Sequence, residues 1–166
     1  MSAMPFVATM NGIADIYKIR LADGRVTPLT QTPNDESYPR WSPDGRFLVF
    51  SREYQEQYDL VLKDLDSGEE TRLTHTPHDE LSPFFTPGGE ALIYVCDQEG
   101  IFNLHWLDLQ NGTSWPLTRV IGGIFSPQVS HDGQRVLFSY FRHGQYRIFQ
   151  SPMLAKVPGA GDAGGS

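Results

Sequence analysis

The side chains best suited to chemistry lie in two matching acidic loops. Asp35-Glu36 and Asp79-Glu80 stand 44 residues apart, and each pair follows a Thr-Pro dipeptide after one intervening residue. Carboxylates at matched places could line a polar or cation-binding mouth. The structural interpretation is that each acid accepts backbone N–H bonds and holds its turn. Because a residue that recurs in step with a repeat usually serves the fold, the structural interpretation is favoured.

Histidines accompany the second acidic pair. His75, His78 and Asp79 form a local cluster. Their spacing matches no established zinc pattern, and a third strong ligand would have to come from elsewhere in the chain. We therefore predict a solvated loop, with no metal and no cofactor. His78 remains a candidate binding residue with the four acids, whereas His105 and His131 do not stand out as ligands or bases.

No pattern for nucleophilic catalysis is present. The chain lacks a G-x-S-x-G elbow. Cys96 ends an expected strand with no histidine at a telling offset, so it is predicted to be a half-buried free thiol. Gly88-Gly89 and Gly122-Gly123 stand in turns with no following helix, which excludes a phosphate-binding loop. We therefore predict no catalytic residue and no enzymatic activity.

Aromatic residues offer two further candidate surfaces. Tyr38, Trp41, Phe84, Phe85 and Phe125 cluster in expected inner strands, where they could grip a peptide or sugar, although packing between neighbouring blades is favoured.

The second candidate surface contains Trp106 and Trp115. No tryptophan stands at the equivalent positions 44 residues away in the sequence. An exposed Trp115 would indicate a contact surface, so Trp115 joins the candidate binding residues.

Composition excludes several classes of function. The chain has 166 residues and a net charge of -7, and its Lys and Arg residues are scattered, so nucleic acid is not an expected partner. One cysteine permits no internal disulfide. No apolar run approaches the roughly 20 residues that span a bilayer. The first residues carry no charged and apolar segments of an export signal, so we expect any such signal to lie outside this chain.

A strict repeat organises the chain. Pro39, Pro83 and Pro127 are each 44 residues apart, and so are the turns at Asp44-Gly45, Gly88-Gly89 and Asp132-Gly133. Apolar residues alternate with polar ones, as in strands, and no helix is expected. A period of 40–45 residues that holds four strands is typical of a β-propeller blade.

Four copies of this unit fill the chain, and each would contain an inner, a second, a third and an outer strand. The third strands are expected at Asp15–Ile19, Asp59–Leu62, Asn103–Trp106 and Arg147–Gln150. The outer strands end in Leu29-Thr30, Leu73-Thr74 and Leu117-Thr118. The first copy lacks its inner strand and the fourth lacks its outer one. We predict an all-β chain of about four blades over residues 5–153, with a flexible Gly/Ala-rich tail over 154–166.

The turn sequence Trp41-Ser42-Pro43-Asp44-Gly45 and its continuation resemble a known family. Together with Asp59-Leu60 and Leu73-Thr74, it is similar to the WD40-like repeat of TolB-type β-propellers. The resemblance covers about residues 5 to 153. It implies a bacterial, periplasmic scaffold that binds a protein or peptide partner through rim loops or the central channel. The third and fourth copies are degenerate but keep the spacing.

The resemblance leaves alternatives open. The chain could be the propeller domain of a larger enzyme, as in prolyl-oligopeptidase-like peptidases, or belong with the oligogalacturonate lyases that share these repeats. The lyase would need a cluster of histidines that the sequence lacks, and the peptidase would need a hydrolase domain. Incomplete terminal blades also predict a partial propeller or half of an oligomeric ring, and the partial propeller is favoured. In either case we expect self-association.

Overall fold

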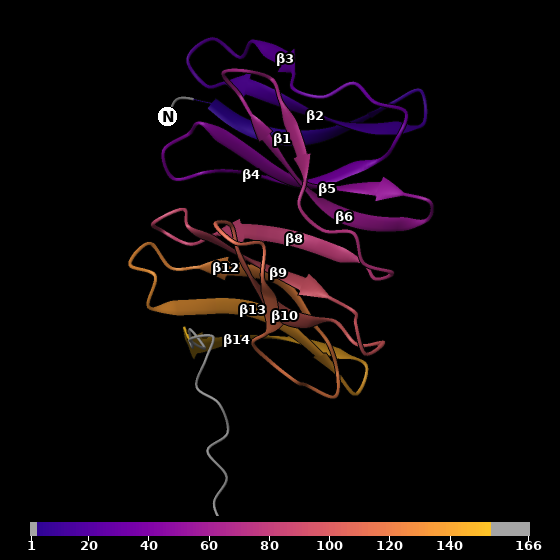
Figure 1. Ribbon diagram of the computed structural model, residues 1–166, viewed down its shortest axis with the longest axis vertical. Helices are drawn as coiled ribbons and strands as arrows, with labels where there is room; N and C mark the ends of the chain where they lie inside the picture. The colour runs from indigo at the N-terminus through magenta and orange to yellow at the C-terminus, as the bar shows by residue number, and fades with distance from the viewer. Residues whose placement is uncertain (1–2, 154–166) are drawn as a thin grey trace, which may run out of the picture.

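The computed structural model describes residues 3–153, and every regular element in that range is a β-strand (Figure 1). The first blade contains β1 (Ala3–Met10), β2 (Ile13–Arg20) and β3 (Val26–Pro28). The second contains β4 (Glu36–Trp41), β5 (Phe47–Tyr54), β6 (Gln57–Asp64) and β7 (Glu70–Arg72). The third contains β8 (Glu80–Phe85), β9 (Ala91–Cys96), β10 (Asn103–Asp108) and β11 (Ser114–Pro116). The fourth contains β12 (Ile124–Val129), β13 (Arg135–Arg142) and β14 (Gln145–Pro152).

Each blade is one antiparallel sheet whose strands follow chain order. The predicted all-β class and the partial propeller of four blades are confirmed. As expected, the first blade has no inner strand and the fourth has no outer strand among residues 3–153. The predicted tail over 154–166 lies outside the described residues.

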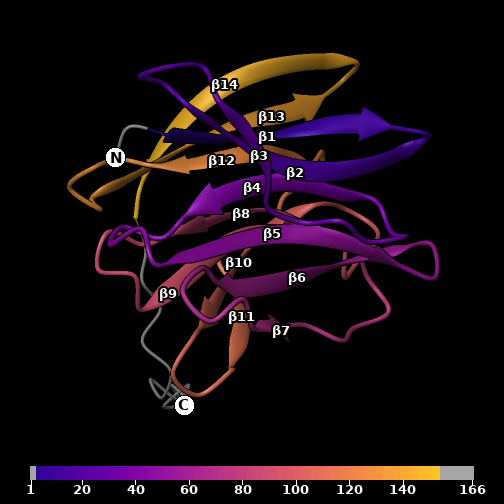
Figure 2. The same cartoon turned by 90° about the horizontal axis from the view of Figure 1, so that it is seen from above.

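The blades stack in sequence order, from the first at the top of Figure 1 to the fourth at the bottom. Each inner strand packs on the preceding blade: β4 contacts β1 and β2, β8 contacts β5 and β6, and β12 contacts β9 and β10. No strand of the first blade contacts the fourth within the described range. The blades therefore form an open arc, and Figure 2 shows the strong twist of β13 and β14 at its free end.

Three apolar cores hold the arc together, one at each junction. Neighbouring residues of a single strand enter different cores, since Leu48 belongs to the first junction and Val49 to the second. Likewise Leu92 faces the second blade and Ile93 faces the fourth. Successive side chains of a strand point to opposite faces, so an internal blade is apolar on both.

Within the described residues, the outer faces of the first and fourth blades have no neighbouring blade. Exposed apolar side chains gather there, including Met10 in the first blade and Tyr146 and Ile148 in the fourth, the last 79% exposed. An internal blade would bury these positions.

The repeated prolines lie inside the inner strands. We expected Pro39 to open its strand, but β4 begins three residues earlier, at Glu36. The register shifts between Ser37 and Arg40, and Tyr38 adopts a left-handed backbone with φ of 54°. This bulge leaves the proline without a ladder partner, so its missing N–H costs no hydrogen bond.

A threonine ends each complete outer segment and ties it to the third strand. The hydroxyl oxygens of Thr30, Thr74 and Thr118 accept hydrogen bonds from the backbone N–H groups of Ile16, Leu60 and Leu104, each at 2.9 Å. The repeated Leu-Thr ending of the sequence therefore has a direct structural purpose.

We predict that Thr74→Val lowers the free energy of unfolding by about 1–3 kcal/mol, because the buried N–H of Leu60 loses its acceptor. Thr74→Ser keeps the hydroxyl and should retain most of the stability. Denaturant unfolding followed by tryptophan fluorescence measures both variants. Equal losses for valine and serine would show that the hydroxyl is not the stabilising group.

Candidate functional site

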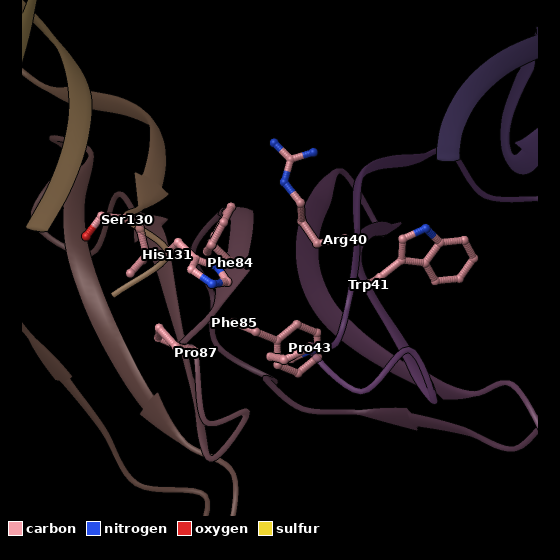
Figure 3. A pocket seen from close by; sticks show the side chains of 9 residues that line it. Arg40, Trp41, Pro43, Phe84, Phe85, Pro87, Ser130 and His131 are labelled. Carbon is pink, nitrogen blue, oxygen red and sulfur yellow. The ribbon is translucent and has the colours of Figure 1, made fainter. Parts of the chain in front are cut away.

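A cavity of about 420 Å³ opens where the ends of three inner strands converge. It is lined by Arg40, Trp41, Pro43, Phe84, Phe85, Pro87, Val129, Ser130 and His131. Figure 3 shows Arg40 of β4, Phe84 and Phe85 of β8, and His131 just after β12 around this space, whereas the ring of Trp41 points away from them.

The 44-residue repeat brings the cavity residues together. Trp41, Phe85 and Val129 are equivalent positions in successive blades, and Pro87 is equivalent to His131. Their strands lie side by side, so residues distant in sequence form one wall. The cavity is therefore a product of blade stacking.

The cavity is apolar with a few polar groups at its edge. Phe85 and Val129 are buried, whereas Arg40 and His131 are exposed. The Arg40 guanidinium carbon lies 5.9 Å from the centroid of the Phe84 ring, a cation–π arrangement. No carboxylate in residues 3–153 lies within ion-pair distance of Arg40. Such a site can hold an apolar side chain and attract a negative charge.

The acidic loops lie at the other end of the inner strands. Glu36 begins β4 and Trp41 ends it, so the acids and the cavity are separated by the length of the strand. Asp35 accepts a hydrogen bond from the Ala14 N–H at 2.8 Å, and Asp79 accepts one from the Tyr58 N–H at 3.0 Å. Each bond joins a loop to the blade before it.

Glu36 is fully buried in an ionic network. Its Oε1 accepts a hydrogen bond from Arg52 Nε at 2.7 Å, and Arg52 also pairs with Glu70 at 2.7 Å. Lys63 completes the network at 2.9 Å from Glu70. Burial raises the pKa of Glu36, while hydrogen bonds from threonine hydroxyls and the charge of Arg52 oppose that rise.

Glu80 occupies the equivalent place without a cation. Cys96 pairs with it in register, where Arg52 pairs with Glu36. No lysine or arginine among the described residues forms an ion pair with Glu80. Burial, reinforced by the nearby Asp59 carboxylate, raises the pKa of Glu80 to about 7. Burial also raises the pKa of the Cys96 thiol, which favours the neutral, unreactive form.

The other candidate residues lie apart from the cavity. His78 is half-buried, with Nδ1 4.0 Å from Asp97 Oδ1. Trp115 is half-buried in the outer strand β11 and stacks on Trp106, with ring centroids 5.9 Å apart. The two acidic loops both lie close to Tyr58, because burial and the charges of Asp35 and Asp79 raise the pKa of its hydroxyl. Trp115 lies in an outer strand of the third blade.

Residues 3–153 contain no group of three or more His, Cys, Asp or Glu side chains arranged to hold a metal ion. None of these residues forms a helix that could cross a membrane. Sequence reasoning missed Arg40 and assigned no role to His131. The 44-residue repeat could have indicated both residues, because equivalent positions in successive inner strands become neighbours in space.

Comparison with solved structures identifies the fold. A putative TolB from Agrobacterium tumefaciens superposes with a TM-score of 0.83 at 22% identity, covering 92% of this chain and 58% of that protein. TolB from Acinetobacter baumannii gives 0.79 at 22% identity, with 91% and 38% covered.

The chain has a TolB-type β-propeller fold. It spans 58% of the length of the first of these propeller proteins and 38% of the second. A puromycin-hydrolyzing peptidase from Mycobacterium tuberculosis also shares the fold, with a TM-score of 0.71 at 16% identity over 93% of this chain and 28% of that protein. The family model of the dipeptidyl peptidase IV N-terminal region matches residues 9–86. A search of curated proteins found no match.

We predict unequal effects on stability for two matched substitutions in this propeller. Glu36→Gln removes one of the two carboxylates that pair with the buried Arg52, but it also relieves the burial that raises the pKa of Glu36, so at pH 8 it should change the free energy of unfolding less than Glu80→Gln does. Glu80→Gln removes an acid that has no cationic partner, so at pH 8 it should raise stability.

The effect of Glu80→Gln on the free energy of unfolding depends on pH. A folded-state pKa above the unfolded value means that the native state holds the proton more strongly, so the stability due to Glu80 falls as pH rises from about 4.5 through about 7. The advantage of Glu80→Gln should therefore be present at pH 8 and lost at pH 5. Thermal unfolding at several pH values measures it. Parallel pH profiles for the wild type and Glu80→Gln would contradict the assignment.

Proposed function

We propose that the chain is a non-catalytic interaction module whose cavity binds a segment of a protein or peptide partner. The observation that carries this proposal is the cavity at the converging inner strands, with apolar walls and the unpaired Arg40 at its edge. Its volume of about 420 Å³ lies in the range of ligand sites.

The lining specifies the chemistry of the bound segment. Phe84, Phe85 and Pro87 suit a proline or aromatic side chain, which buries apolar surface with little loss of conformational freedom. Arg40 suits a carboxylate next to that residue, because the guanidinium offers paired donors. We therefore infer an acidic segment with an aromatic or proline residue as the ligand.

Peptide display tests this function. A random 12-residue phage library panned on the wild type should enrich acidic sequences with aromatic residues or proline. Arg40→Glu should reduce binding of the selected peptides at least tenfold, because it replaces attraction by repulsion. Arg25→Glu, the same charge change on the exposed surface of the first blade, is the matched control. Failure to enrich any sequence, or equal effects of the two variants, would overturn the assignment.

The open terminal blades support a second part of this proposal: association with another copy or with the remainder of a larger propeller. Leu137 is equivalent to Val49, which packs in the core between the second and third blades, yet Leu137 is 41% exposed. Covering that surface would remove apolar area from water.

Light scattering tests this association. The wild type should form dimers or larger species as concentration rises. Leu137→Glu should weaken them, whereas Ile121→Glu, at a residue that is 76% exposed but lies in a loop, should not. A compact monomer at high concentration would contradict self-association.

A second candidate function is a propeller domain of a larger peptidase. The match of residues 9–86 to the dipeptidyl peptidase IV N-terminal region and the similarity to a puromycin-hydrolyzing peptidase favour it. The cavity would then contact a peptide substrate on its way to a hydrolase domain. An antibody raised against this chain should detect, in cells of its source, a larger polypeptide that reacts with a fluorophosphonate probe. Detection of an unreactive polypeptide would exclude a serine hydrolase.

A further inference from the structure

The fourth blade leaves one edge of β14 unpaired among residues 3–153. In each of the other blades a three-residue strand covers this edge. The strands β3, β7 and β11 do so in one register, since Pro28 pairs with Tyr17, Arg72 with Val61 and Pro116 with His105. The equivalent residue of β14 is Phe149.

The backbone that follows each outer strand defines a second contact. The N–H groups of Leu29, Leu73 and Leu117 donate to the carbonyls of Ile16, Leu60 and Leu104 at 2.7–2.8 Å. The next threonine accepts from the N–H of the same residue, as described above. By the repeat, Ile148 of β14 presents the same carbonyl and N–H, and it is 79% exposed. The edge therefore has the register and the free backbone groups for a strand that ends in Leu-Thr.

The charges beside this edge differ from those of the second blade. There Asp59 pairs with Arg72 of the outer strand. In the fourth blade Arg147 stands at the place of Asp59, and Arg142 at that of Tyr54. Both arginines line a cavity of about 340 Å³, together with Tyr140, His143, Gln145 and Phe149. Neither arginine forms an ion pair within the described residues.

We propose that the free edge of β14 is a strand-addition site for an extended segment of a partner protein with the pattern acid-Leu-Thr. The acid lies opposite Phe149 and pairs with Arg147, as Arg72 pairs with Asp59 with the charges exchanged. Leucine and threonine bind the backbone of Ile148. Main-chain hydrogen bonds supply affinity in such strand addition, and the charge supplies specificity.

A second copy of this chain is a poorer occupant. Its own Leu-Thr segments follow Pro28, Arg72 and Pro116, none of which is acidic, and each already covers an edge of its own blade. This site lies on the outermost strand of the fourth blade and is distinct from the cavity at Arg40, so it goes beyond the function proposed above.

The test uses a fluorescein-labelled peptide with the sequence of residues 67–78 and glutamate in place of Arg72. Fluorescence anisotropy should show this peptide binding at least tenfold more tightly than the peptide with the original arginine. Arg147→Asp should reverse the preference. Replacing Leu-Thr by Ala-Ala in the glutamate peptide should abolish binding. Arg25→Glu, the same charge change on the exposed surface of the first blade, should leave binding unchanged.

Amide shifts locate the bound peptide. Labelled protein titrated with the glutamate peptide should show its largest shifts at Ile148 and Gln150. If Arg147→Asp proves unstable, Arg147→Gln gives the same test through loss of preference without reversal. Equal binding of the two peptides, or shifts elsewhere, would overturn the proposal. A gain in affinity after deletion of residues 154–166 would also overturn it, because the edge would then belong to the chain's own end.

Discussion

Blade stacking requires an internal strand to bury both of its faces. The clearest case is β9, in which all six residues are buried. Its alternate residues enter two separate cores, so a change at Leu92 affects the second blade and a change at Ile93 affects the fourth. The same requirement fails at the two ends of the arc, where one face of each terminal blade has no neighbouring blade within residues 3–153. The exposed apolar residues of the first and fourth blades follow from that single constraint.

The three junctions satisfy this constraint with different chemistry at one repeated position. Where the loop enters the inner strand, the first junction buries an ion pair between Glu36 and Arg52. The second buries Glu80 opposite Cys96, with no compensating cation. The third buries Ile124 beside Tyr140, with no acid at all. Because a buried ion pair is seldom better than an apolar pair of similar volume, the third solution meets the constraint most simply.

The fold was predictable because successive copies of the repeat show the same pattern of strands and turns. The prolines and glycine-containing turns, spaced by 44 residues, located the inner strands of the second, third and fourth blades. The third strands recurred from Asp15–Ile19 onward, and the two missing strands followed from counting. The internal position of Pro39 was not predictable, because the bulge depends on how Ser37 and Arg40 pair with β5. The burial of Glu36 was equally hidden: it depends on a register that places Arg52 opposite the acid. The cavity needed knowledge of which blades are neighbours, since no local sequence pattern contains it.

Function in such a chain should arise where equivalent positions differ, because positions that agree already serve the fold. Arg40, Phe84 and Gln128 are equivalent in the inner strands, yet only Arg40 brings a charge to the cavity. Arg147 likewise departs from the Asp59 of the second blade. Both differences place an arginine where a surface is open instead of where a neighbouring blade covers it. In a chain of net charge -7 each of these arginines places a positive charge on an open surface, and this contrast is the reason that acidic segments are the proposed ligands.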